Sequence, residues 1–175
     1  AGASKIRLNP SNMPRKALSN IVGEARDRGT VIRIGVNRGS FHKSMAIEDL
    51  VTYTKENIDL LEKERFYNIV VSIKASDVKS TIMANRLLHN EMPYPIHIGL
   101  TEAGYGKLAE VKSSIAIGSL LSDNIGDTIR VSLTGNPIKE VDLAKDILKA
   151  TGKRKNFVDI ISCPTCARTE INIIN

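Results

Sequence analysis

The chain has 175 residues, 42% of them hydrophobic and 25% charged, which is typical of a globular domain and enough to form a core. No apolar run approaches the roughly 20 residues of a membrane helix and no signal-peptide pattern opens the chain, so we expect a soluble, cytoplasmic protein without membrane contact. The net charge of +6 permits nucleic-acid binding, but dispersed basic residues and an aromatic content of 4% without tryptophan argue against it.

Six short runs rich in β-branched residues alternate with helical patterns, which predicts βα units and a parallel sheet. The predicted strands span residues 6–9, 31–36, 68–75, 95–100, 128–133 and 158–162. Their nearly continuous apolar character suits strands that are covered on both faces.

The segments between these strands show apolar residues at helical spacing. In chain order, the predicted packing faces contain Leu18, Ile21, Val22 and Ala25; Ile47, Leu50, Val51, Thr54, Ile58 and Leu61; Val78, Ile82 and Leu87; Leu108, Val111, Ile115 and Leu120; and Val141, Ile147 and Leu148. Asp77 is the predicted N-cap of the third helix, and Gly29 and Gly152 are predicted helix stops.

Such an alternation forms either a doubly wound sheet or a (β/α)8 TIM barrel, and both place functional groups at the C-terminal ends of the strands. A whole barrel has about 250 residues. We therefore expect an incomplete barrel. No GxGxxG or GxxxxGK[ST] pattern is present, which argues against a dinucleotide-binding domain and a nucleoside triphosphatase.

Polar residues recur toward the ends of successive predicted strands: Arg7, Asn9, Arg33, Asn37, Lys74, His97, Glu102, Arg130 and Ser132. A cation within an apolar strand is costly to bury unpaired, so four of them indicate a shared anionic partner such as a phosphate or diphosphate. The alternatives are internal salt bridges or charges that reach solvent. Glu102 fits a general acid or base, or a partner that orients an arginine. His97 is more simply a hydrogen-bonded core residue.

Several glycines lie near these strand ends, Gly35 and Gly99 among them. Tight turns and close approach of the backbone to a phosphate both favour glycine, and turns alone would explain them.

The chain has two cysteines, Cys163 and Cys166, in the sequence Cys-Pro-Thr-Cys after the last predicted strand. A redox dithiol, half of a zinc site and part of an iron–sulfur cluster all fit this spacing, as do two inert thiols. The histidines show no ligand spacing that would complete a zinc site. A cluster would need further ligands from outside this chain.

The blocks RLNPSN, RIGVNRGS, SIKAS, HIGLTEAG, AEVKSSIAIGSLLSDNIGDTIRVSL and ISCPTCARTE, in this order, resemble the family of 4-hydroxy-3-methylbut-2-enyl diphosphate synthases. The resemblance implies a TIM barrel followed by an α+β domain that binds a 4Fe-4S cluster through three cysteines and a glutamate. The implied reaction, in isoprenoid biosynthesis, is the reductive ring opening of 2-C-methyl-D-erythritol 2,4-cyclodiphosphate, with electrons from ferredoxin or flavodoxin. It also implies a homodimer, in the bacterial cytoplasm or a plant plastid.

Carried over to this sequence, the resemblance implies roles for individual residues. Arg7, Arg33, Lys74 and Arg130 would bind the diphosphate, supported by Asn9, Asn37 and Ser132; Glu102 would be the acidic group beside the substrate; and Cys163 and Cys166 would be the first two cluster ligands. Residues 1–157 would form the C-terminal portion of the barrel and residues 158–175 the start of the cluster domain. Because the other cluster ligands lie outside the chain, we expect it to be inactive alone. The alternatives are another TIM-barrel enzyme for a phosphorylated small molecule, and a noncatalytic fragment that only folds or self-associates.

Overall fold

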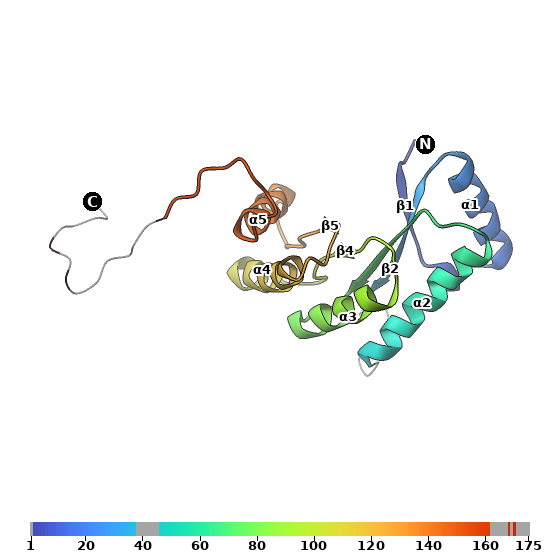
Figure 1. The fold of residues 1–175 in the computed structure, drawn as a ribbon, viewed down its shortest axis with the longest axis horizontal. Coiled ribbons are helices and arrows are strands. Elements are labelled where there is room, and N and C mark those ends of the chain that lie inside the picture. Colours follow the sequence, from blue (N-terminus) through green and yellow to red (C-terminus); the bar gives the residue numbers. More distant parts are fainter. Residues whose placement is uncertain (1, 38–45, 162–167, 169, 171–175) are drawn as a thin grey trace.

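Parallel β-strands and helices alternate along the chain in the computed structural model, which describes residues 2–37, 46–161, 168 and 170. The elements, in order, are β1 (Lys5–Leu8), η1 (Pro10–Asn12), α1 (Arg15–Asp27), β2 (Val31–Asn37), α2 (Ile47–Lys63), β3 (Ile69–Lys74), α3 (Val78–Glu91), β4 (His97–Ile98), α4 (Gly106–Ser122), β5 (Thr128–Ile129) and α5 (Pro137–Ala150) (Figure 1). This order confirms the predicted βα units.

The strands lie side by side in sequence order. β1, β2 and β3 form one parallel sheet, and β4 and β5 form another. A parallel bridge between Val71 and Ile96 joins the two, with Val71 N donating to Pro95 O at 2.9 Å. Within the described residues, neither β1 nor β5 has a second neighbouring strand, so the sheet does not close. The predicted incomplete barrel is therefore confirmed.

The hydrophobic core lies between the sheet and its helices. Along β2, Ile32, Ile34 and Val36 are each fully buried, while the alternating Val31 and Arg33 are only partly buried. Because side chains of a strand alternate between its two faces, one face of the sheet packs on the helices and the other faces the barrel interior. Consecutive helices from α2 to α5 contact one another and complete the outer layer.

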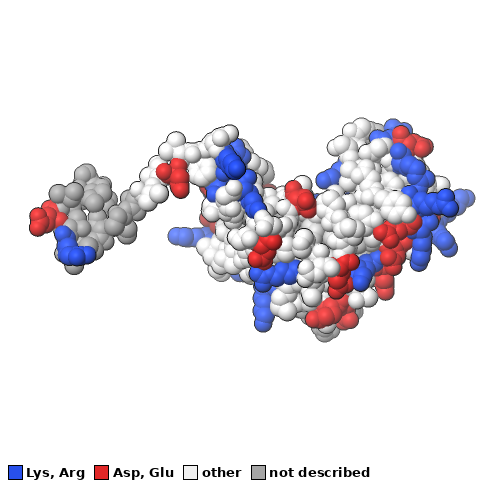
Figure 2. Space-filling view, in the orientation of Figure 1, with Lys and Arg blue, Asp and Glu red and all other residues white. Residues whose placement is uncertain are grey.

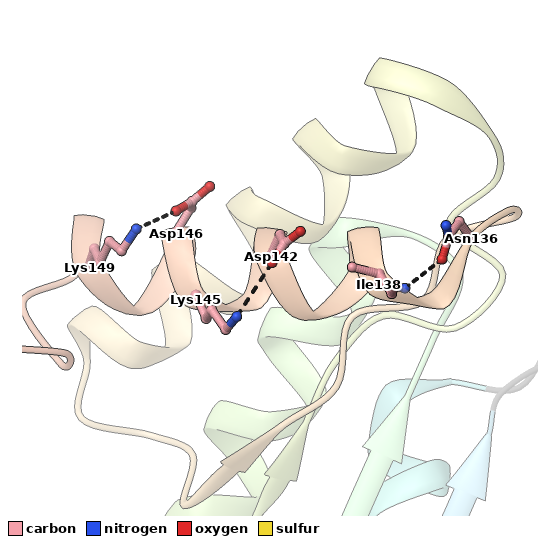
Figure 3. Close-up of polar contacts among 6 residues, drawn as sticks. All are labelled: Asn136, Ile138, Asp142, Lys145, Asp146 and Lys149. Carbon is pink, nitrogen blue, oxygen red and sulfur yellow. Dashed lines mark hydrogen bonds and ion pairs between the residues drawn. The ribbon is translucent and has the colours of Figure 1, made fainter.

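Helix ends follow the predicted capping residues. The Asp77 carboxylate accepts a hydrogen bond from Ser80 N at 2.8 Å, which confirms it as the N-cap of α3. Gly29 and Gly152 have φ values of 63° and 68°, the left-handed conformation that terminates helices. Asn136, which was not among the predicted caps, caps α5 by accepting from Ile138 N at 3.0 Å (Figure 3).

The predicted packing face of α4 is largely wrong. Leu108, Val111 and Ile115 are 64%, 43% and 50% exposed, and small residues such as Ala109 and Ala116 are buried in their place. Small residues allow α4 to approach its neighbours closely, so the larger apolar residues face outward.

The other predicted faces agree better with the structure. Leu18, Val22 and Ala25 on α1 are buried, and so are all the predicted residues of α2 except Ile47, which is partly buried. On α3 the prediction is shifted around the helix, because Ala84 and Leu88 are buried whereas Ile82 and Leu87 are only partly buried. On α5, Ile147 is buried, Leu148 is partly buried, and Val141 is 53% exposed.

The predicted sixth strand is wrong over residues 158–161, where the chain has no regular secondary structure. Val158, Ile160 and Ile161 are 87%, 84% and 94% exposed, and the segment leads away from α5 (Figure 1). A β-branched run needs a neighbouring strand to pair with, and no described strand lies beside this one. Residue 162 lies outside the described residues. None of the described helices is long and apolar enough to cross a bilayer.

Candidate anion-binding site

Strand register brings the predicted cations to one face of the sheet. Arg7 on β1 is in register with Arg33 on β2, and Asn37 on β2 with Lys74 on β3. The Val71–Ile96 bridge continues the register to place Lys74 beside Gly99. The pairing of Ile98 with Ile129 continues it again to Arg130, whose N donates to Ile98 O at 3.0 Å. We call Arg7, Arg33, Lys74 and Arg130 the cation cluster.

Lys74 lies at the centre of the cation cluster and is 3% exposed. It makes no hydrogen bond or ion pair with the described residues. Burial lowers the pKa of Lys74 to about 7, and the nearby charges of Arg130, Arg33 and Arg7 contribute to this shift. A buried ammonium near guanidinium groups is destabilised in its charged form unless an anion neutralises it.

Arg33 and Arg7 share this electrostatic environment. Burial, followed by the charges of Arg7 and Arg130, lowers the pKa of Arg33 from its ordinary value. The Arg7 guanidinium lies across β2, where its Nη2 donates to Gly35 O at 2.9 Å. Arg7 and Arg130 are exposed and Arg33 is partly buried, so the alternative of charges that reach solvent holds for two of the four cations.

Internal salt bridges are not found in the described part of the chain. The ion pairs there lie on helices or at their ends: Arg28–Glu24, Lys55–Glu91, Arg86–Asp123, Lys145–Asp142 and Lys149–Asp146, the last two along α5 (Figure 3). On the surface drawn in Figure 2, Lys and Arg are interspersed with Asp and Glu. The cation cluster differs, because no described carboxylate forms an ion pair with any of its four members.

Two glycines make room for the cation cluster. A Cβ on Gly35 would lie 2.2 Å from Arg7 Nε, and a Cβ on Gly99 would lie 2.3 Å from the carbonyl oxygen of Arg130 and 3.3 Å from Lys74 Nζ. Both distances to the nearest atom are too short for a real side chain. These glycines therefore hold space for charged side chains and for the adjoining strand, a role that turn chemistry does not explain.

Gly35→Ala is expected to weaken anion binding with little loss of stability. The atoms that the new methyl meets belong to the Arg7 side chain, which can rotate away at the cost of its bond to Gly35 O. We expect the Kd for pyrophosphate to rise about tenfold, the loss of one charge-assisted contact, and the melting temperature to stay within about 2 °C, as for a surface change. Calorimetric titration and thermal unfolding measure both; an unchanged Kd would mean that Arg7 does not contact the anion.

The remaining predicted residues differ in how near they lie to the cation cluster. Asn37 ends β2 beside Lys74, and the half-buried Ser132 lies two residues beyond Arg130. Asn9 directly follows β1, where the Tyr53 hydroxyl donates to Asn9 Oδ1 at 3.2 Å, and no hydrogen bond joins Asn9 to a described cation.

Glu102 lies in the loop between β4 and α4 and is exposed. Its φ of 54° is a left-handed conformation that is unusual for a residue with a side chain. Such strain is often retained at functional loops, where the surrounding structure enforces it. The structure thus places Glu102 in the loop after β4, and among the described residues no hydrogen bond or ion pair joins it to the cation cluster.

Cys163 and Cys166 lie outside the described residues, so their predicted role as cluster ligands has no geometry to test it. Within the described part of the chain, no group of three or more His, Cys, Asp or Glu side chains is arranged to hold a metal ion.

Sequence reasoning missed His97, which it interpreted as a simple core residue. His97 is 8% exposed, and its Nδ1 lies 2.8 Å from Thr128 Oγ1, so the expected hydrogen bond is present. Its Nε2, however, is buried without a partner among the described residues. Strand alternation could have found this residue, because His97 and Gly99 face the same side of β4.

Four converging cations without carboxylates can bind a polyanion. Arginine offers paired donors that match phosphate oxygens, and Lys74 adds a point charge. Lys74 ends β3 and Arg130 directly follows β5, so both lie at the C-terminal edge of the sheet, where barrel enzymes bind their substrates, whereas Arg33 lies within β2. An anionic group with several charges, such as a diphosphate, fits this arrangement better than a single carboxylate.

Comparisons with known proteins show the family of this chain. Three relatives are each named 4-hydroxy-3-methylbut-2-en-1-yl diphosphate synthase (flavodoxin). They come from Thermotoga petrophila, Caldanaerobacter subterraneus subsp. tengcongensis and Thermodesulfovibrio yellowstonii, at 52%, 47% and 47% identity. The alignments cover 99%, 99% and 98% of this chain and 51%, 51% and 52% of the relatives, so the chain spans about half their length. The GcpE TIM-barrel domain matches residues 1–145, and the chain therefore belongs to the GcpE TIM-barrel domain family.

Proposed function

We propose that this chain forms the diphosphate-binding side of the barrel in a 4-hydroxy-3-methylbut-2-enyl diphosphate synthase. The cation cluster is the observation that supports it. A cyclic diphosphate would bind with its phosphates against Arg7, Arg33, Lys74 and Arg130, and the enzyme would open its ring reductively to the linear diphosphate. The names of the relatives support this reaction and flavodoxin, rather than ferredoxin, as the electron donor.

The chain's own residues would bind and orient the substrate. Neutralising the diphosphate would stabilise the charge that develops as the ring C–O bond breaks. Asn37 and Ser132 would donate further hydrogen bonds to phosphate oxygens, and Asn9 would do so from the end of β1. Glu102, in the loop above the strands, would deliver a proton or hold the substrate hydroxyl.

The proposed 4Fe-4S cluster would be held in part by Cys163 and Cys166. Two thiolates at this spacing suit neighbouring corners of a cluster, so the donor chemistry fits. When bound, the cluster would supply the electrons for C–O cleavage. Its other ligands would come from outside this chain, and we therefore propose that the chain alone binds substrate without turning it over. The division into a barrel portion at residues 1–157 and a cluster-domain start at 158–175, the homodimer and the cytoplasmic location also remain proposals.

Calorimetric titration of the chain with 2-C-methyl-D-erythritol 2,4-cyclodiphosphate tests the central proposal. We expect saturable binding that Arg33→Ala weakens about tenfold to a hundredfold, the usual effect of removing a charge-assisted contact. Arg28→Ala is the matched control, because Arg28 pairs with Glu24 on the surface at 2.8 Å, away from the sheet interior.

Two outcomes would contradict the proposal. Equal loss in Arg28→Ala and Arg33→Ala would indicate nonspecific charge attraction. Equally tight binding of simple phosphate monoesters would favour the alternative, another barrel enzyme that acts on a phosphorylated small molecule.

A further inference from the structure

The orphaned nitrogen of His97 points to a ligand contact. Nε2 of this residue is buried and lacks a hydrogen-bond partner among the described residues, although Nδ1 is satisfied by Thr128. Buried polar atoms without partners are rare in folded proteins, and each calls for a physical explanation such as a bound molecule.

Strand register places this ring inside the cation cluster. His97 pairs with Thr128 on β5, and the Val71–Ile96 bridge sets it beside Ser72 on β3. Gly99 is the next residue of β4 on the same face, and Lys74 Nζ would lie 3.3 Å from a Cβ there. The His97 ring and the Lys74 ammonium therefore occupy successive positions on the interior side of β4.

The ring is uncharged at ordinary pH. Burial first, then the charges of Lys74, Arg33, Arg130 and Lys5, lower the pKa of His97 to about 3. A neutral imidazole has one nitrogen that donates and one that accepts. When the Thr128 hydroxyl donates to Nδ1, the ring proton must be on Nε2, the buried atom without a partner.

We propose that His97 is a further anion-binding residue, whose Nε2–H donates a hydrogen bond to the phosphate or diphosphate group held by the cation cluster. In this arrangement the Thr128 hydroxyl, 2.8 Å from Nδ1, is the donor, which places the ring proton on Nε2. This inference rests on the proposed function, because it requires an anion at the cation cluster. A neutral donor contributes to binding without adding to the repulsion among the four cations, which another positive charge would increase.

Two substitutions separate this role from a structural one. The amide of His97→Asn can replace Nδ1 and keep the bond to Thr128, whereas the longer His97→Gln can place an N–H near the position of Nε2. Titration with inorganic pyrophosphate is expected to show a Kd raised about tenfold to a hundredfold in His97→Asn, since a hydrogen bond to a charged group is lost. His97→Gln should retain most of the affinity. His89→Gln, at an exposed histidine on α3, is the matched control and should bind like wild type.

A long-range ¹H–¹⁵N correlation spectrum of the pyrophosphate-bound chain supplies a readout that does not depend on affinity. We expect one neutral His97 ring protonated at Nε2 and unchanged from pH 6 to pH 8. A ring that titrates in this range, a proton on Nδ1, or wild-type affinity in His97→Asn would overturn the inference while leaving pyrophosphate binding by the cation cluster intact. Failure of the wild-type chain to bind pyrophosphate would instead overturn the anion site itself, and the role of His97 with it.

Discussion

Lys74→Met is expected to stabilise the ligand-free chain and to abolish its affinity for pyrophosphate. Lys74 is 3% exposed, and three guanidinium groups lie near its ammonium. Methionine has a similar length but no charge, so the substitution removes this buried charge. Replacing buried charges with apolar side chains of similar volume often stabilises a protein by about 1–4 kcal/mol. The same change removes the central point charge of the cation cluster.

The stability advantage of Lys74→Met over the wild type should depend on pH. The pKa of Lys74 falls from 10.5 to about 7 on folding, so between these values the unfolded chain binds a proton that the folded chain does not. The free energy of unfolding of the wild type should therefore rise by roughly 1.4 kcal/mol per pH unit above about pH 7, and this contribution should be flat below it. Lys74→Met should lack this slope, so its advantage is largest at acidic pH.

Urea unfolding from pH 6 to pH 9, with and without saturating pyrophosphate, measures both effects. The difference between wild type and variant cancels the titration of other groups. A bound anion favours the charged ammonium, so pyrophosphate should also flatten the wild-type slope. Lys55→Met is the control, because Lys55 is exposed and pairs with Glu91 at 2.8 Å. A variant less stable than wild type at pH 6 would mean that Lys74 has a partner in the folded chain, and the account of the site would be wrong.

The sequence was sufficient to place the four cations in or beside predicted strands, because the side chains of a strand alternate with a period of two. Residues two apart on a strand share a face, and parallel strands end at the same edge of a sheet, which predicted that Lys74 and Arg130 lie near each other. Arg33 pairs with Val70, four residues before Lys74, so its nearness to Lys74 depends on the strand register and not on the strand ends. The helix caps at Asp77 and Gly29 were equally local. Features that depend on a few neighbouring residues are those that pattern reasoning recovers.

The features that it missed depend on long-range contacts. The hydrogen bond between His97 and Thr128 joins residues 31 positions apart. Only the pairing of β4 with β5 shows that Nδ1 has a partner while Nε2 has none among the described residues. The outward face of α4 was missed for a related reason. The buried face of α4 contains small residues such as Ala109 and Ala116. The prediction was based on large apolar residues such as Leu108, which faces away from the core.

Residues 158–161 show that a local pattern can also predict a strand that does not form. Val158 and Ile160 favour extended structure, but a strand forms only when a neighbour satisfies its backbone groups. The role of Gly35 and Gly99 was also invisible in the sequence, where they resembled turn residues. Only the positions of Arg7 and Arg130 show that each glycine lies under another strand's atoms.

Gly99→Ala is expected to damage both the sheet and the anion site, although it adds a single methyl group. The new Cβ would lie 2.3 Å from the carbonyl oxygen of Arg130, a backbone atom that cannot rotate away. The adjoining peptide is held in place because Arg130 N donates to Ile98 O at 3.0 Å. Relief of the clash must therefore separate β4 from β5 and displace Arg130 and Lys74.

The contrast with Gly35→Ala defines the measurement. Both add the same methyl on the same face of the sheet, but at Gly35 the obstacle is the flexible Arg7 side chain. We expect Gly99→Ala to lose about 1–3 kcal/mol in urea unfolding, as for other overpacked sites, to bind pyrophosphate at least about tenfold more weakly, and to lose hydrogen-exchange protection at the Arg130 amide. Gly118→Ala on α4 is the control, since its Cβ would be in ordinary contact with Thr151 at 3.8 Å and alanine favours a helix. Wild-type stability and affinity in Gly99→Ala would show that β5 can shift freely, and that the register of Arg130 beside Lys74 does not define the site.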